Sequence, residues 1–117
     1  MLGEKEITSL YIARLDQYMV ELKNGLLHSD FQFNAVARAL KVEPEILSET
    51  ILKITGETPG QLYEERILKI SKELLLNSND PIADIAGMLA YDLPNFTRFF
   101  KSYAGISPQQ FRDLNRM

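Results

Sequence analysis

Apolar residues recur every three to four positions along most of the chain, the spacing that places them on one face of an α-helix. The first such segment carries an apolar face from Ile7 to Leu22 and meets a stop signal at Asn24-Gly25. No segment shows the sustained alternation of apolar and polar residues that predicts a β-strand. The pattern therefore predicts an all-α fold.

Proline, glycine and capping residues divide this pattern into seven predicted helices. Asn34 and Asp80 are placed to cap helices at their N-terminal ends, and Gly56 and Gly105 follow the last turns of two others. Two helices begin with matching capping boxes, which start at Thr58 and Ser107. The expected helices cover about residues 7–22, 34–40, 44–55, 59–76, 81–89, 94–104 and 108 to the end of the chain.

The second half of the chain repeats the first without a gap when the sequence is shifted by 49 residues, so that Ala37 falls on Ala86. The shared outline is helix, short turn, helix, Gly-x-[Ser/Thr]-Pro, helix, which describes a helix-turn-helix with a supporting helix. A hairpin duplicated only for packing fits two copies as well as a DNA reader does. We expect a single domain, residues 1–117, in which a long linker helix joins two helix-turn-helix subdomains. The first subdomain spans residues 5–57, the linker helix residues 58–77 and the second subdomain residues 78–117.

Charge is distributed unevenly. Residues 1–65 hold six Lys/Arg against eleven Asp/Glu, whereas residues 66–117 hold seven against five. A polyanion should therefore prefer the C-terminal half. The chain has no cysteine, which excludes disulfides and thiolate sites, and no apolar run approaches the roughly 18 residues that span a bilayer. We expect no membrane association, and a cytoplasmic location because the start does not resemble a signal peptide.

The predicted helix near residues 94–104 has the most informative surface. Asn95, Arg98 and Ser102 share a polar stripe, with Thr97 and Lys101 beside it. Arg98 has the geometry to bind a guanine edge, and Lys101 and Ser102 suit phosphates. An ordinary solvated helix face is the alternative. The opposite side should supply the core of this half, from Ile82, Ile85, Leu89, Phe96, Phe99, Phe100 and Tyr103.

The equivalent upstream helix presents Glu45, Ser48, Glu49 and Leu52, with Lys53 beside them. Carboxylates accept hydrogen bonds from cytosine but are repelled by phosphates. This surface is therefore predicted to face solvent or a protein partner rather than DNA.

Candidate catalytic groups do not form a site. His28 stands alone without a second metal ligand at suitable spacing, and Glu64 and Glu65 diverge on a helix. No glycine-rich phosphate loop occurs. We expect no enzyme activity, no metal and no cofactor, and a small hydrolase is the least favoured class.

The segments IADIAGMLAYD and FTRFFKSYAGISPQQFR resemble the C-terminal signature of the AraC/XylS family of bacterial transcription regulators. The segment VARALKVEPEILSETILKITGETPGQL resembles that family's first helix-turn-helix, so the resemblance covers about residues 14–115. It implies two recognition helices that read successive major-groove segments of double-stranded promoter or operator DNA. The positions implied to face bases are Arg98, Asn95 and Pro94 in the second helix and Glu45, Ser48 and Glu49 in the first. Thr97, which flanks the polar stripe of the second helix, is a further candidate base contact.

The chain departs from the family pattern at three places. Glu49 stands where an arginine is frequent, and the second turn is one residue shorter than usual. Ala90 replaces the usual glycine at a position where a positive φ is expected, at a cost of about 1 kcal/mol.

The sequence thus predicts a sequence-specific DNA-binding domain. Its N-terminal sensor or dimerisation domain is expected to lie outside this chain unless the chain is a standalone member, and RNA polymerase is a further candidate partner. The rival hypothesis is a protein-interaction module of the same fold with an acidic first unit. Expected phosphate contacts are Lys53, Lys101, Ser102, Arg112 and the capped helix starts at Thr58 and Ser107.

Overall fold

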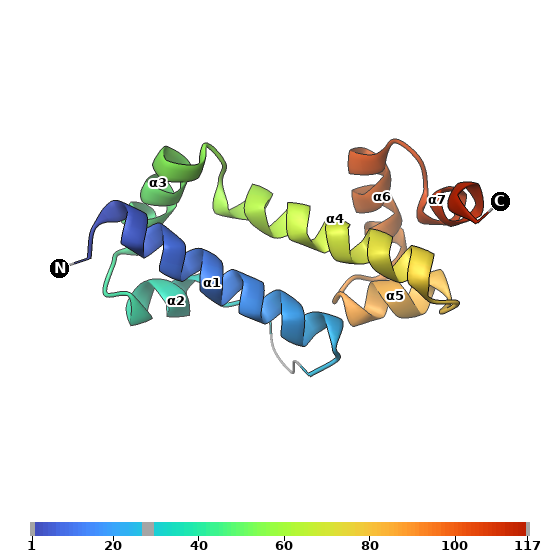
Figure 1. The fold of residues 1–117 in the computed structure, drawn as a ribbon, viewed down its shortest axis with the longest axis horizontal. Helices are drawn as coiled ribbons and strands as arrows, with labels where there is room; N and C mark the ends of the chain where they lie inside the picture. The colour runs from blue at the N-terminus through green and yellow to red at the C-terminus, as the bar shows by residue number, and fades with distance from the viewer. Residues whose placement is uncertain (1, 27–29, 117) are drawn as a thin grey trace. The chain divides into compact units, whose positions relative to one another are not determined.

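The computed structural model describes residues 2–26 and 30–116 and contains seven α-helices and no strand within those ranges (Figure 1). The all-α prediction is therefore confirmed. The helices are α1 Glu4–Lys23, α2 Phe33–Ala39, α3 Pro44–Thr55, α4 Pro59–Asn77, α5 Ile82–Met88, α6 Leu93–Ala104 and α7 Pro108–Asn115.

The chain divides into two compact units, residues 1–65 and 66–117. The division falls inside α4, so the first turns of this helix belong to one unit and its remainder to the other. It also separates the acidic half of the sequence from the basic half described above. Each unit contains one helix-turn-helix pair, α2–α3 in the first and α5–α6 in the second.

The first unit is built on the apolar face of α1, which packs against α3. Tyr11 and Leu15 are almost fully buried, as are Leu47 and Ile51 of α3. Aromatic rings extend this core beyond α1: Phe31 meets Tyr11 edge-on at a centroid distance of 5.9 Å. Such pairs stabilise a core beyond the area that they bury.

The second unit has a core of aromatic and aliphatic side chains between α5, α6 and α7. Phe96 and Phe100 are fully buried, and the Phe100 ring meets Phe111 edge-on at 5.4 Å. Ile85 and Leu89 are buried as expected. Ile82 and Phe99 are only partly buried, and the prediction that Tyr103 is a core residue is wrong. Its side chain is 45% exposed and packs on Phe99 at the edge of the unit.

Local hydrogen bonds fix most helix ends where the sequence places them. Both capping boxes form: the amides of Gln61 and Gln110 donate to the hydroxyls of Thr58 and Ser107, each over 3.1 Å. The expected caps at Asn34 and Asp80 are wrong. Asn34 lies inside α2, which begins after Gln32, and the N-cap of α5 is Pro81.

The turn inside each helix-turn-helix pair has the same geometry in both units. Lys41 has a φ of 59° and Ala90 a φ of 65°, so both are left-handed, and they are equivalent under the 49-residue shift. The amides that follow them donate to the carbonyls of Ala37 and Ala86 over 3.0 and 2.9 Å. This is the Schellman ending of a helix, which usually has glycine at the left-handed position. The positive φ expected at Ala90 is therefore confirmed.

The last turn of α4 is closed by an arginine from α7. Arg112 is 8% exposed, and its Nε donates to the carbonyl of Leu75 over 3.0 Å. Its Nη1 donates to the carbonyl of Asp80 over 2.7 Å, and its Nη2 to that of Ser78 over 3.4 Å. The bond to Leu75 satisfies a carbonyl that the end of α4 leaves without a partner, and the other two hold the segment that follows the helix. The expected phosphate contact of Arg112 is corrected accordingly: its guanidinium faces the protein backbone.

Replacing Ala90 with glycine should raise the free energy of unfolding by about 0.5–1 kcal/mol. The left-handed conformation costs an L-residue about 1–2 kcal/mol, and the greater freedom of glycine in the unfolded chain offsets part of the gain. Urea unfolding followed by circular dichroism measures the change. In the control Ala83→Gly, at a helical position of α5, stability should fall by up to about 1 kcal/mol. A loss of stability in both variants would contradict the strain at Ala90.

Replacing Arg112 with methionine should lower the free energy of unfolding by about 3 kcal/mol, because buried carbonyls lose charged donors while the volume of the side chain is retained. The same urea titration measures it. Arg116→Met is the matched control, since Arg116 also donates to the carbonyl of Leu75, over 3.1 Å, but is exposed. Its loss should be less than half as large, and equal losses would refute the buried role of Arg112.

Candidate nucleic-acid interface

The outward face of α6 carries polar and cationic side chains, and the opposite face of the helix carries aromatic ones. Pro94, Asn95, Arg98, Lys101 and Ser102 are all exposed, and Thr97 is partly buried beside them. Because Phe96 and Phe100 on the opposite side of α6 are buried in the second unit, the outward face remains available to a partner. Its charge and its helical geometry are those required of a helix that enters a major groove.

Three residues at the start of α6 form a chain of hydrogen bonds along this face. The carboxylate of Asp92 caps the helix by accepting from the Asn95 amide over 2.8 Å. Its second oxygen accepts from the Asn95 side-chain nitrogen over 2.7 Å. The side-chain oxygen of Asn95 in turn accepts from Nη2 of Arg98. This chain of bonds was not predicted from the sequence, although an N-cap aspartate three residues before an asparagine is a recognisable local signal.

The outward face of α3 has the opposite charge at equivalent positions. Under the 49-residue shift, Glu49 corresponds to Arg98 and Leu52 to Lys101. Glu45 and Glu49 are exposed, Ser48 is partly buried, and Leu52 is 48% exposed. This face therefore carries a carboxylate and an apolar side chain where α6 carries cations.

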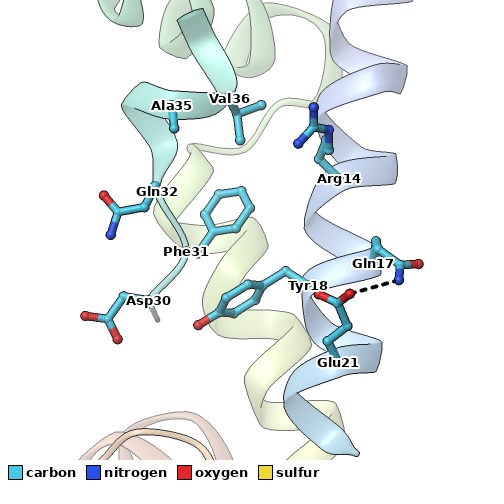
Figure 2. Close-up of a pocket in the computed structure, with 9 residues that line it drawn as sticks. All are labelled: Arg14, Gln17, Tyr18, Glu21, Asp30, Phe31, Gln32, Ala35 and Val36. Atoms are coloured by element: carbon cyan, nitrogen blue, oxygen red, sulfur yellow. Dashed lines mark hydrogen bonds between the residues drawn. The ribbon is translucent and has the colours of Figure 1, made fainter. Parts of the chain in front are cut away.

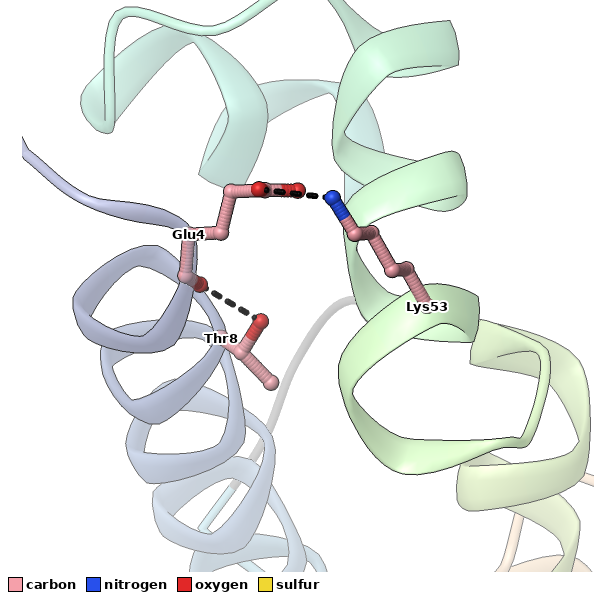
Figure 3. A network of polar contacts seen from close by, with 3 residues as sticks. All are labelled: Glu4, Thr8 and Lys53. Atoms are coloured by element: carbon pink, nitrogen blue, oxygen red, sulfur yellow. Dashed lines mark hydrogen bonds and ion pairs between the residues drawn. The ribbon is translucent and has the colours of Figure 1, made fainter.

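Lys53, the cation of α3 itself, is already paired. Figure 3 shows Nζ of Lys53 facing the carboxylate of Glu4 from α1, at 3.0 Å, while the Thr8 hydroxyl donates to the Glu4 carbonyl. The side chains of Lys53 and Glu4 are 68% and 50% exposed, so water screens the pair. A phosphate contact by Lys53 would have to compete with this carboxylate.

The other expected phosphate ligands are positioned differently from one another. Lys101 is exposed on α6, whereas the hydroxyl of Ser102 donates to the carbonyl of Phe99 over 2.7 Å. The backbone amides of Thr58 and Ser107 donate to Oε1 of their capping glutamines over 2.8 and 2.9 Å. These two amides thus serve the capping boxes.

A separate pocket of about 370 Å³ lies in the first unit, between α1 and the segment that leads into α2 (Figure 2). Tyr18 and Phe31 meet edge-on there at 5.2 Å, with Arg14 and Asp30 nearby. Glu21 accepts a long hydrogen bond from Gln17 at 3.4 Å. The lining mixes both signs of charge with aromatic rings and lacks the cluster of cations that a phosphate backbone requires.

Other chemistry has little support in the parts of the chain that the structure describes. Residues 2–26 and 30–116 contain no group of three or more His, Asp or Glu side chains placed to hold a metal ion. His28, considered above as a lone histidine, lies outside the described residues. None of the described helices is long and apolar enough to cross a membrane.

Known proteins share both the sequence pattern and the fold of this chain. Residues 36–114, which include both turns and both outward-facing helices, match the family described as a helix-turn-helix domain. The chain belongs to the AraC-type helix-turn-helix family. Double-stranded DNA is the partner of this class of domain.

Individual known proteins are similar to this chain in sequence or in fold. The chain is 27% identical over 112 residues to YtdP, an uncharacterized HTH-type transcriptional regulator of Bacillus subtilis, and the match covers 89% of this chain but 14% of YtdP. Among solved structures, the C-terminal domain of the response regulator AraT from Geobacillus stearothermophilus is similar, with a TM-score of 0.70 and 28% identity over 86% of this chain and 84% of that one. The DNA-binding domain of AdpA, solved with a target DNA, has the same fold, with a TM-score of 0.72 and 20% identity over 89% of this chain and 91% of that one.

Proposed function

We propose that this chain is the DNA-reading domain of a bacterial AraC-like transcription regulator and that α6 is its principal reader of the major groove. The observation that carries this proposal is the exposed cationic face of α6, with Arg98 at its centre, on a unit with seven Lys/Arg against five Asp/Glu. Promoter DNA in the bacterial cytoplasm is the expected partner.

Contacts are assigned by the chemistry of each side chain. Arg98 forms the base contact, because a guanidinium donates two parallel hydrogen bonds to O6 and N7 of guanine. Pro94, Asn95 and Thr97 lie beside it and are proposed to meet neighbouring base edges. Lys101 and Ser102 are proposed phosphate ligands. Phosphate contacts set the register of the helix on the duplex and carry no sequence information themselves.

We propose that α3 contributes less to DNA binding than α6. Glu45, Ser48 and Glu49 occupy the places where a reader helix would meet bases, but two carboxylates there repel the phosphates on either side of the groove. Any contacts from Glu45 or Glu49 to cytosine amino groups are therefore weak in this proposal. Lys53 is only a secondary phosphate ligand in this proposal, because Glu4 already pairs with it. The helix starts at Thr58 and Ser107 are secondary as well, because their amides already donate to Gln61 and Gln110.

The acidic face of α3 favours a second candidate function, contact with a protein. Glu45, Glu49 and the exposed Leu52 offer carboxylates around an apolar centre, which suits a cationic protein surface. A sensor or dimerisation domain and RNA polymerase are the proposed partners. The chain spans only 14% of the length of YtdP, so further domains in the same polypeptide are consistent with this view. Linkage to a second DNA-binding unit would raise affinity through effective concentration.

Substituting Arg98 with alanine should lower the affinity for the preferred site about 5- to 150-fold, because one bidentate base contact contributes about 1–3 kcal/mol. Arg98→Lys should lose most of the same preference while retaining affinity for unrelated DNA, because lysine keeps the charge but not the planar fork. Fluorescence anisotropy with sites selected from random duplexes measures both affinities. Lys101→Ala is the control and should weaken all duplexes alike. Unchanged site preference in Arg98→Ala would exclude α6 as the reader.

Reversing charge on α3, with Glu45→Lys and Glu49→Lys together, should raise the affinity for unrelated DNA severalfold, because phosphate repulsion is replaced by attraction. If α3 serves a protein contact, the same double variant of the full-length regulator should lose transcriptional output at its promoter despite occupying it. Promoter occupancy and transcript level, measured together, separate the two effects. Normal output at normal occupancy would argue against a protein contact through α3.

A further inference from the structure

The chain of hydrogen bonds at the start of α6 constrains what this helix can recognise. Asp92 is an acceptor at both carboxylate oxygens, and Arg98 offers only donors. Asn95 lies between them, so its nitrogen must face Asp92 and its oxygen must face Arg98. Both bonds are present: the nitrogen donates to Asp92 over 2.7 Å, and the oxygen accepts from Arg98. Turning the amide over would set donor against donor and acceptor against acceptor. The orientation of Asn95 is therefore dictated by its two neighbours.

This orientation decides which groups remain for DNA. Bidentate recognition of adenine by asparagine uses the side-chain oxygen and nitrogen together, accepting from N6 and donating to N7. In Asn95 each end already makes one bond, to Arg98 or to Asp92, which fixes the direction of the amide and leaves one hydrogen and one lone pair for DNA. The guanidinium of Arg98, with five N–H donors, gives one to Asn95 and keeps others for the two acceptors of guanine.

We propose that Asp92 is a specificity-determining residue, which through Asn95 holds Arg98 as a guanine reader. This inference rests on the proposed function of α6. Asp92 itself touches no base; it is a positioning residue that acts through Asn95. Its second task, capping the helix through the Asn95 amide at 2.8 Å, places the carboxylate where both bonds are possible.

Asp92→Asn is the sharpest test, because asparagine caps a helix about as well as aspartate and has the same shape. One of its two terminal atoms becomes a donor, so it cannot accept from both the amide and the side-chain nitrogen of Asn95. If the cap is kept, Asn95 must turn over, so that its oxygen faces the new donor at position 92 and its nitrogen faces Arg98, which releases the guanidinium. Asp84→Asn is the matched control, since Asp84 is an exposed carboxylate in the first turn of α5 and lies outside the hydrogen-bond chain.

The experiment measures the affinity of the 117-residue chain for duplexes that differ only in guanine or adenine at the position that Arg98→Ala identifies. Wild type and Asp84→Asn should share one guanine-to-adenine preference. In Asp92→Asn that preference should fall about tenfold, without a loss of affinity for unrelated DNA. Asn95→Ala should lower it similarly, and adding Asp92→Asn to Asn95→Ala should have no further effect, since both remove the same link.

The outcomes separate the inference from the function on which it rests. If Asp92→Asn and Asp84→Asn keep the same preference, the inference is wrong even though Arg98 reads DNA. If Arg98→Ala leaves every base preference intact, the proposed role of α6 fails first. Circular dichroism confirms that each variant is folded. Should Asp92→Asn unfold, Asn95→Ala alone decides, because an unchanged guanine preference in that variant also contradicts the proposal.

Discussion

Each helix-turn-helix pair depends on one residue that adopts a left-handed backbone. Lys41 and Ala90 let the chain reverse just after α2 and α5, so that the next amide bonds back to a carbonyl inside the helix, at Ala37 or Ala86. Ala37 and Ala86 are fully buried. The direction in which the chain leaves this turn sets which side of α3 or α6 meets the core and which side faces outward. The outward chemistry of both helices therefore follows from a backbone conformation that neither turn residue favours.

The two units show how one backbone supports two surfaces. Leu47 and Phe96 occupy equivalent buried positions, so the inward-facing residues differ mainly in size. The outward positions differ in charge, with Glu49 in α3 against Arg98 in α6. Core positions constrain the fold and outward positions constrain the partner, so duplication of the unit leaves the partner free to differ. Near DNA, the cationic helix is attracted and the acidic helix is repelled.

Some features encoded within four residues could be predicted from the sequence, although the caps expected at Asn34 and Asp80 are wrong, and features that join distant segments could not. The capping box at Ser107 is confirmed because its partners lie three residues apart. Periodicity separated Phe96 and Phe100 from the outward face but misplaced Tyr103, which lies at the rim where one face gives way to the other. The buried role of Arg112 depends on carbonyls more than thirty residues away, which no local pattern reveals. The base contacts remain predictions, because they depend on a duplex.

The arginines at the end of the chain bear on the polyelectrolyte behaviour of the second unit. Arg112 and Arg116 both donate to backbone carbonyls at the end of α4. A cation releases condensed counterions from DNA only when it approaches a phosphate. The formal charge of this unit therefore overstates the number of counterions it displaces, and the entropy that this release supplies is correspondingly small. Recognition by such a domain depends more on the fit of a few hydrogen bonds than on attraction to the duplex as a whole.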